Sequence, residues 1–203
     1  MKLKKSLIIK AASEVIARNG VDRTRIEDIS KTANISKGII YDHFIGKEEI
    51  VTEVFHQNGE RFFSKIKKGI SKSYSSQQNL KNIFQMIEKT LLHESLMSTL
   101  LYTHIIELTK NKNPEFRKMS DNYYNNFKTL LKELIDEGIK KEEINVKNAE
   151  FLSSVVLSTI DGLILQYIFN LKNYQENVSK ILNGLYKYFF DTTKKEIKNV
   201  QKK

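Results

Sequence analysis

The sequence predicts an all-α fold of about nine helices. Its 203 residues contain one proline and eight glycines, so few positions break a helix. Apolar residues recur at the three- and four-residue spacing of a helix face through one stretch after another. Hydrophobic residues make up 40% of the chain, which is enough for packed cores and too many for a disordered polymer.

The helices are expected in order along the chain, separated by short breaks. Asn19-Gly20 predicts a left-handed cap after the first helix. The Ser/Gln-rich stretch 71–79 is the clearest loop, and Asn113-Pro114 predicts a stop and a new helix with Asn113 as its N-cap. The expected helices span 3–18, 24–33, 36–44, 47–68, 80–93, 96–109, 114–138 and 146–169, with a ninth running from 174 into the lysine-rich tail.

The most informative segment runs from residue 24 to residue 47. Thr24 and Glu27 have the spacing of a capping box, which predicts Thr24 as the N-cap of a short helix. Asn34 begins a break, and Ser36 is the expected N-cap of a second short helix that ends at Phe44. Two short helices joined by a tight turn are typical of a helix-turn-helix.

The second short helix is expected to present polar and aromatic side chains to solvent. Ile40 and Phe44 lie one turn apart and can both face inward. The residues then left outside are Lys37, Gly38, Tyr41 and His43. A small helix with these side chains suits contact with DNA phosphates and base edges.

At this segment the chain resembles the tetracycline-repressor (TetR-like) family of bacterial transcriptional regulators. The resemblance covers roughly the first quarter of the chain. The residues that carry it are Thr24-Arg25, Glu27-Asp28-Ile29, Ala33-Asn34-Ile35-Ser36, the run Lys37-Gly38-Ile39-Ile40-Tyr41-Asp42-His43-Phe44, and Lys47-Glu48-Glu49. It implies a helix-turn-helix DNA-binding domain in residues 1–46 and a larger helical effector-binding and dimerisation domain in residues 47–203.

The expected partner of the first domain is double-stranded operator DNA, with ordinary solvated surface as the alternative. Two residues depart from the family pattern. Asn34 replaces the usual turn glycine but tolerates left-handed backbone, and Asp42 places a carboxylate on the reading helix, so base preference cannot be carried over from relatives. The expected DNA-binding residues are Thr24, Arg25, Ser36, Lys37, Gly38, Ile39, Tyr41, Asp42, His43 and Lys47.

The second domain is expected to form a homodimer and to bind a small hydrophobic effector. The helix over 146–169 is apolar on nearly all sides, so its own domain can cover one face and a second copy another, although a central helix of a monomer would read the same. The expected dimer interface is Leu152, Val156, Ile160, Ile164, Ile181, Leu185 and Tyr188. The family implies a pocket, for which the candidates among core-like aromatic and aliphatic faces are Phe62, Met86, Tyr102, Ile105, Tyr123 and Phe127.

Composition narrows the classes of function. The net charge of +10 favours a polyanionic partner, although scattered lysines on solvated helix faces, or codon usage, explain such a balance as well. We expect a cytoplasmic protein without cysteine chemistry, an export signal or a membrane span. His104 and Glu107 share a helix face, but no second pair accompanies them, and no phosphate loop or serine elbow motif is present. We therefore expect no catalytic residues, no metal and no cofactor.

The resulting expectation is a dimeric DNA-binding transcriptional regulator that is not an enzyme. It would repress from a palindromic operator and leave that operator when a small hydrophobic effector binds. The alternative is a DNA-bound factor that recruits another protein and has no small-molecule effector.

Overall fold

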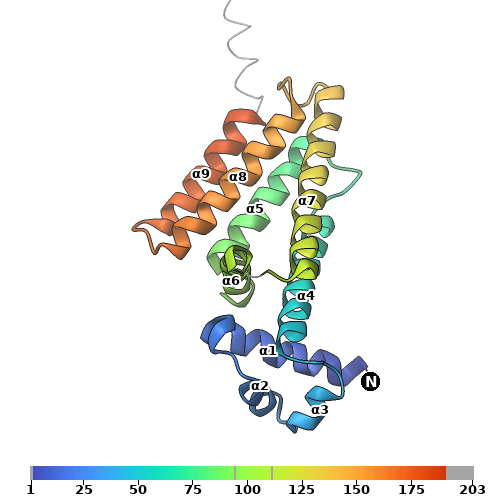
Figure 1. Cartoon of the computed structure of the whole chain (residues 1–203). Helices are drawn as coiled ribbons and strands as arrows, with labels where there is room; N and C mark the ends of the chain where they lie inside the picture. The colour runs from blue at the N-terminus through green and yellow to red at the C-terminus, as the bar shows by residue number, and fades with distance from the viewer. Residues whose placement is uncertain (1, 94, 111, 191–203) are drawn as a thin grey trace, which may run out of the picture. The chain divides into compact units, whose positions relative to one another are not determined.

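A computed structural model describes residues 2–93, 95–110 and 112–190 of the chain (Figure 1). Every regular element within these ranges is a helix. The helices are α1 (Lys2–Arg23), α2 (Ile26–Ala33), α3 (Lys37–Tyr41), α4 (Lys47–Lys68), α5 (Ser76–His93), α6 (Ser95–Lys110), α7 (Pro114–Lys140), α8 (Ala149–Ile168) and α9 (Tyr174–Phe189). The all-helical prediction is confirmed, while the part of the expected ninth helix that falls on 191–203 lies outside the described residues.

The first helix runs further than expected. It was predicted to end at Arg18, but α1 continues to Arg23 across a kink at Gly20. Gly20 has φ +71° and ψ 168°, so its φ is positive as expected, but its ψ is not that of a left-handed cap. This region of backbone conformation is open essentially to glycine alone. The glycine therefore bends the chain where a break was predicted, and one more helical turn follows.

The stretch read as a loop over 71–79 is partly helical, since α5 begins at Ser76 rather than at Leu80. The Ser75 hydroxyl accepts a hydrogen bond from the Gln78 N–H (3.1 Å), as an N-cap does. The Asn79 side chain is buried and bonds both the N–H and the carbonyl of Ser71 (3.0 Å each). Serine and asparagine that suggested a loop thus form the cap and first turn of a helix.

The described chain packs as two compact units. Unit 1 comprises Met1–Phe62 and Glu94–Asp121, and unit 2 comprises Phe63–His93 and Asn122–Lys203. The boundary falls within α4 and within α7, so each of these helices contributes to both units. These are units of packing. The functional division at residue 46 stays a prediction.

Unit 1 has one core that joins the first four helices to α6 and the start of α7. Its fully buried side chains come from α1 to α4, and Leu100 of α6 and Phe116 of α7 complete the same cluster. The α6 segment is therefore packed with the helix-turn-helix, against α1. Its buried aliphatic and aromatic residues include Ile8, Ile16, Ile29, Ile40, Phe44, Ile50, Val54 and Phe55.

In unit 2, α9 packs against both α5 and α8 (Figure 1). Gly138 near the end of α7 is required by close packing, because a Cβ there would collide with the side chain of Ile144 and lie 2.9 Å from the Ser76 Cβ. By length and composition α8 could cross a membrane, but core helices of soluble proteins pass the same test, and the test is weak for one helix. One face of α8 is buried in unit 2.

Candidate nucleic-acid interface

The start of α2 differs from its prediction by one residue. Arg25, not Thr24, is the N-cap, and the Asp28 carboxylate accepts a hydrogen bond from the Arg25 N–H (3.3 Å). Thr24 is 1% exposed and its hydroxyl donates to the Gly20 carbonyl (2.7 Å). The expectation that Thr24 caps the helix and contacts DNA is therefore wrong, because the kink at Gly20 offers its hydroxyl a nearer acceptor.

The turn between α2 and α3 has the predicted conformation. Asn34 adopts left-handed backbone with φ 52° and ψ 47°. The Asn34 N–H donates to the Lys31 carbonyl (3.2 Å), and the Ile35 N–H donates to the Ser30 carbonyl (3.1 Å). This pair of bonds is a Schellman motif, in which Asn34 takes the left-handed position that glycine usually occupies. The turn fixes the direction in which α3 leaves α2.

The reading helix α3 is capped as expected and is shorter than expected. The Ser36 hydroxyl accepts from the Ile39 N–H (3.4 Å), which confirms Ser36 as the N-cap. The helix ends at Tyr41 rather than at Phe44, because the N–H groups of His43 and Phe44 both turn onto the Ile40 carbonyl (3.0 and 2.9 Å). Ile40 and Phe44 nevertheless face inward, at 0% and 2% exposed.

The remaining candidates around α3 lie toward solvent. Arg25 and Ser36 are exposed, and Ile39 and His43 are half-buried. A Cβ added at Gly38 would meet only the Ser36 Oγ at 3.7 Å, so packing within the chain does not require glycine there. We call the exposed side of α3 and its C-cap the reading face, which consists of Lys37, Gly38, Tyr41 and Asp42.

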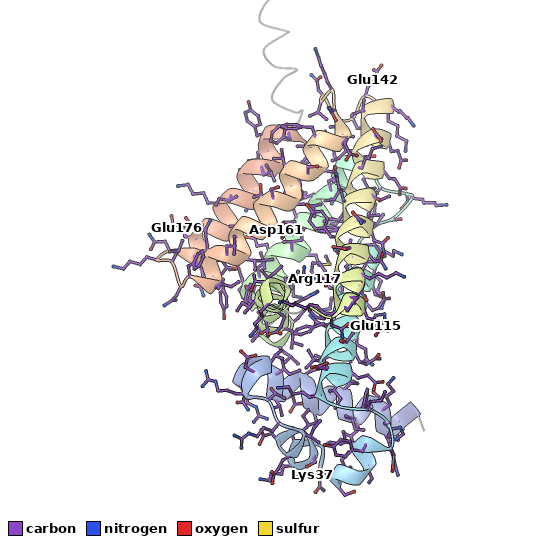
Figure 2. The ribbon with its side chains drawn as sticks, viewed as in Figure 1. Lys37, Glu115, Arg117, Glu142, Asp161 and Glu176 are labelled. Atoms are coloured by element: carbon purple, nitrogen blue, oxygen red, sulfur yellow. The ribbon has the colours of Figure 1, made fainter. Side chains whose placement is uncertain are left out.

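The Lys37 ammonium on this face contacts the carboxylate of Glu27, a residue that the sequence suggested only as a capping-box partner. Its Nζ lies 3.4 Å from Oε2 of Glu27 on α2, and the Nζ of Lys31 lies 3.5 Å from the other oxygen (Figure 2 labels Lys37). Lys37 first, and then Lys31, hold the pKa of Glu27 below its usual value. The Glu27–Lys31 contact follows from i, i+4 spacing on one helix, whereas sequence spacing does not predict the contact of Glu27 with Lys37 across the turn.

Lys47 at the start of α4 has a structural role that was not expected. Its Nζ donates to the carbonyls of Val21 (3.1 Å) and Asp22 (3.4 Å) at the end of α1. The ammonium that was expected to contact phosphate therefore ties the start of α4 to the end of α1. Beside it, the Glu49 carboxylate accepts from the Ile45 N–H (2.7 Å).

His104 and Glu107, considered as a metal pair, contact separate partners in unit 1. The His104 ring stacks on Phe55 and meets Phe116 edge to face, each with 5.1 Å between ring centroids. Its Nε2 lies 2.8 Å from the Ser120 Oγ, and burial lowers the pKa of His104 to about 4. Glu107 pairs with Lys110 (3.0 Å), which also contacts Asp22 (2.6 Å).

Asp22, Lys110 and Lys47 thus meet at the end of α1. Within the ranges that the structure describes, no group of three or more His, Cys, Asp or Glu side chains could hold a metal ion.

The six predicted pocket residues divide between the two units. Phe62, Tyr102 and Ile105 belong to unit 1, and Met86, Tyr123 and Phe127 belong to unit 2. Tyr102 and Phe127 are buried, and the others are half-buried. Unit 2 has a recess of about 30 Å³ between α5 and α9, which has room for only about two water molecules. None of the six predicted residues lines it; its lining includes Lys81, Phe84, Leu182, Asn183 and Tyr186.

The α8 residues that were predicted to form the dimer interface lie on the buried side of the helix, and the exposed residues lie on the opposite side. Leu152, Val156, Ile160 and Ile164 are at most 7% exposed and belong to the core of their own chain, so they cannot meet a second copy. A helix that is apolar all round does not reveal from its pattern which side its own domain covers. The opposite side, which we call the outer α8 face, consists of the exposed Phe151, Ser158 and Leu165, the half-buried Val155 and Gly162, and the exposed C-cap residue Phe169. On α9, Tyr188 is 79% exposed, while Ile181 and Leu185 are half-buried.

Comparison with known proteins decides the family. Residues 8–54 match the model of the bacterial regulatory proteins of the tetR family. The fatty acid metabolism regulator protein of Bacillus subtilis is 24% identical over 82% of this chain and 84% of its own length. Residues 8–54 are a DNA-binding domain of the TetR family. The curated relatives are transcriptional regulators, and the chain is a TetR-like regulator in which the matched residues contain the helix-turn-helix.

Solved structures share the fold of this TetR-like chain over nearly its whole length. The Bacillus subtilis regulator FadR, solved in complex with stearoyl-CoA, superposes with a TM-score of 0.73 at 23% identity, over 89% of this chain and 97% of that one. A putative regulator from Saccharomonospora viridis, solved in complex with choline, gives a TM-score of 0.82 at 21% identity, over 91% and 95%. The two ligands have opposite charge character, so the shared fold alone does not choose between them.

Proposed function

We propose that the chain is a homodimeric repressor that binds a palindromic operator and leaves it when a small hydrophobic effector binds. The observation that carries the proposal is the reading face, in which Lys37 and Tyr41 project from a helix held in place by the Schellman turn and by buried Ile40. An ammonium and a phenol presented this way can contact phosphates and guanine or thymine edges in the major groove.

The outer α8 face supports the dimer. Phe151 and Phe169 are 63% and 67% exposed and Leu165 is 42% exposed, so this side of the helix carries an exposed apolar stripe of the kind that marks interaction sites. A Cβ added at Gly162 on this face, or at Gly184 on α9, would meet no atom within 4 Å. Glycine at an open position lets another helix approach closely. A two-fold dimer places two reading helices against two half-sites.

The first candidate for the effector is a long-chain acyl-CoA. The B. subtilis relative regulates fatty acid metabolism, and its structure was solved with stearoyl-CoA. An acyl-CoA combines an apolar chain with anionic phosphates, and a net charge of +10 favours an anionic ligand. Choline, the ligand of the other neighbour, is the natural competing candidate.

In the proposed mechanism α4 transmits the effector signal. It is one unbroken helix from Lys47, tied to the end of α1, to Lys68 in unit 2. A change in unit 2 that tilts this helix would change the separation of the two reading helices in the dimer. Half-sites repeat every ~34–36 Å, so a mismatch of a few ångströms would remove the contacts of one half-site.

The test is fluorescence anisotropy with a duplex that the protein selects from a random-sequence pool. We expect nanomolar binding, two protomers per duplex and release by oleoyl-CoA but not by free CoA or choline. Binding without release by any of these ligands would favour the alternative, a DNA-bound factor that recruits another protein. Failure to select any sequence would refute the DNA-reading function itself.

A further inference from the structure

The Glu27–Lys37 ion pair joins the two helices of the helix-turn-helix. Glu27 lies in the first turn of α2, and Lys37 is the first residue of α3. One carboxylate oxygen of Glu27 contacts Lys37 at 3.4 Å, and the other contacts Lys31 at 3.5 Å. Glu27 therefore neutralises part of the positive charge beside the reading face.

The Glu27–Lys37 ion pair can break while the helix-turn-helix stays folded. The side chains of Lys37 and Glu27 are 54% and 49% exposed, and neither is required to fill the core. An exposed ion pair is weak because water screens it and because both long side chains lose freedom. The pair can thus compete with DNA for Lys37 without locking the lysine in place.

We propose that Glu27 determines specificity by withholding Lys37 from the phosphates of unrelated DNA. The proposal rests on the DNA-reading function proposed above. Non-specific binding comes from ammonium–phosphate contacts, each of which releases counterions, and it requires no particular geometry. A lysine held by its own carboxylate adds nothing to that binding. An operator base that presents two acceptors, as guanine presents O6 and N7, offers Lys37 a better partner than Glu27.

A different role for Glu27 would be purely structural, as a link between α2 and α3. The Schellman bonds at Asn34 and the buried Ile40 already hold these two helices. A structural link would change the thermal midpoint and weaken all DNA binding equally. A specificity role changes the ratio between operator and unrelated DNA. The two roles therefore predict different measurements.

The experiment compares Glu27→Gln with the unmodified protein on two duplexes of equal length, one selected by the protein and one of unrelated sequence. For the unrelated duplex we expect the slope of log K against log salt to steepen by about 0.9 per protomer, which is one added phosphate contact. We expect its affinity to rise by about fivefold, and operator affinity by less than twofold. Glu133→Gln makes the same change of charge at an exposed position of α7 in unit 2 and should leave both slopes unchanged.

The same substitution in a Lys37→Ala background isolates the pair from Lys31 and from general charge. If Glu27 acts through Lys37, Glu27→Gln no longer steepens the salt slope when Lys37 is absent. An undiminished effect in that background would overturn the proposal, as would equal gains on both duplexes. If the unmodified protein shows no preference for any duplex, the proposed DNA reading fails. A preference that Glu27→Gln leaves intact overturns only the role of Glu27.

Discussion

The reading face of unit 1 and the outer α8 face of unit 2 are both uncovered, and their chemistry differs. The reading face shows an ammonium, a carboxylate, a glycine and a phenol over buried Ile40. The outer α8 face shows two phenylalanines and a leucine separated by serine and glycine. A surface that meets a polyanion has to stay hydrated until it binds, whereas a surface that meets a second copy can stay apolar because it is covered on assembly.

The largest expected effect separates two neighbouring residues of α8. Ile164 is 2% exposed in the core of its own chain, and Leu165 is 42% exposed on the outer α8 face. Ile164→Glu should destabilise the fold by roughly 4 kcal/mol or more, since it buries a carboxylate without a partner. Leu165→Glu should instead leave a folded monomer, with dimer affinity reduced by about 100-fold or more.

Analytical ultracentrifugation and thermal melts distinguish the two outcomes. Tyr124→Glu is the control, because Tyr124 is 44% exposed on α7 and lies off the outer α8 face. A Leu165→Glu protein that sediments as a dimer would show that this face is not the interface.

The next effect tests the interior of unit 1 through pH. Burial lowers the pKa of His104 to about 4, from an ordinary value of 6.5. Between these values the unfolded chain binds a proton that the folded chain does not, so stability is present above pH 6.5 and is lost as the pH falls toward 4. The full loss is about 3 kcal/mol. Urea titrations over this pH window measure it.

His104→Gln is the matched variant for this measurement. It removes the titrating ring while keeping a side chain that can donate to Ser120. Burial raises the pKa of Asp161 on α8, which favours the folded state in acid, the opposite sign. The difference between the unmodified protein and the variant cancels that contribution. Equal pH dependence in both proteins would show that His104 titrates normally and is not enclosed by its aromatic neighbours.

The reading face itself should show effects of intermediate size. Lys37→Ala and Tyr41→Ala should each weaken operator binding by roughly 1–3 kcal/mol, the scale of a base-contacting side chain. Both residues are exposed, so melting temperature and dimer affinity should not change. Anisotropy titrations measure the loss, with Lys180→Ala on α9 as a control for net charge. Affinities within twofold of the unmodified protein for both variants would show that α3 is not the helix that reads the operator.

Local signals predicted most of this fold. The caps at Ser36 and Asn113, the left-handed Asn34 and the inward pair Ile40 and Phe44 were all read correctly, because each depends on residues within one or two turns. The prediction of Thr24 as an N-cap was wrong because a contact outside the capping pattern decides where its hydroxyl bonds. Its capping spacing was genuine, but the kinked Gly20 carbonyl offered a competing acceptor.

Contacts between residues far apart in the sequence, and the side of a helix that its own domain covers, could not be predicted. The Glu27–Lys37 contact exists only because the turn brings residues ten positions apart together. Lys47 contacts the end of α1 from 25 or more positions away. The face of α8 that its own domain covers was assigned to the wrong side, since periodicity in an all-apolar helix favours no side.

The smallest expected effect compares the same backbone conformation in the two regions. Asn34 in the reading turn and Asn170 after α8 have nearly equal left-handed φ angles of 52° and 50°. Alanine is disfavoured there, so Asn34→Ala and Asn170→Ala should each cost ~1 kcal/mol of folding stability, while glycine at either position should be neutral or slightly stabilising. Only Asn34 sets the direction of the reading helix. Asn34→Ala should therefore also weaken operator binding by about twofold to fivefold, beyond any loss from unfolded protein, whereas Asn170→Ala should leave it unchanged. Urea melts and anisotropy titrations on the four variants measure both quantities. Equal effects on operator affinity from the two alanine variants would mean that the turn does not position α3, and that the reading face owes its orientation to the core beneath it.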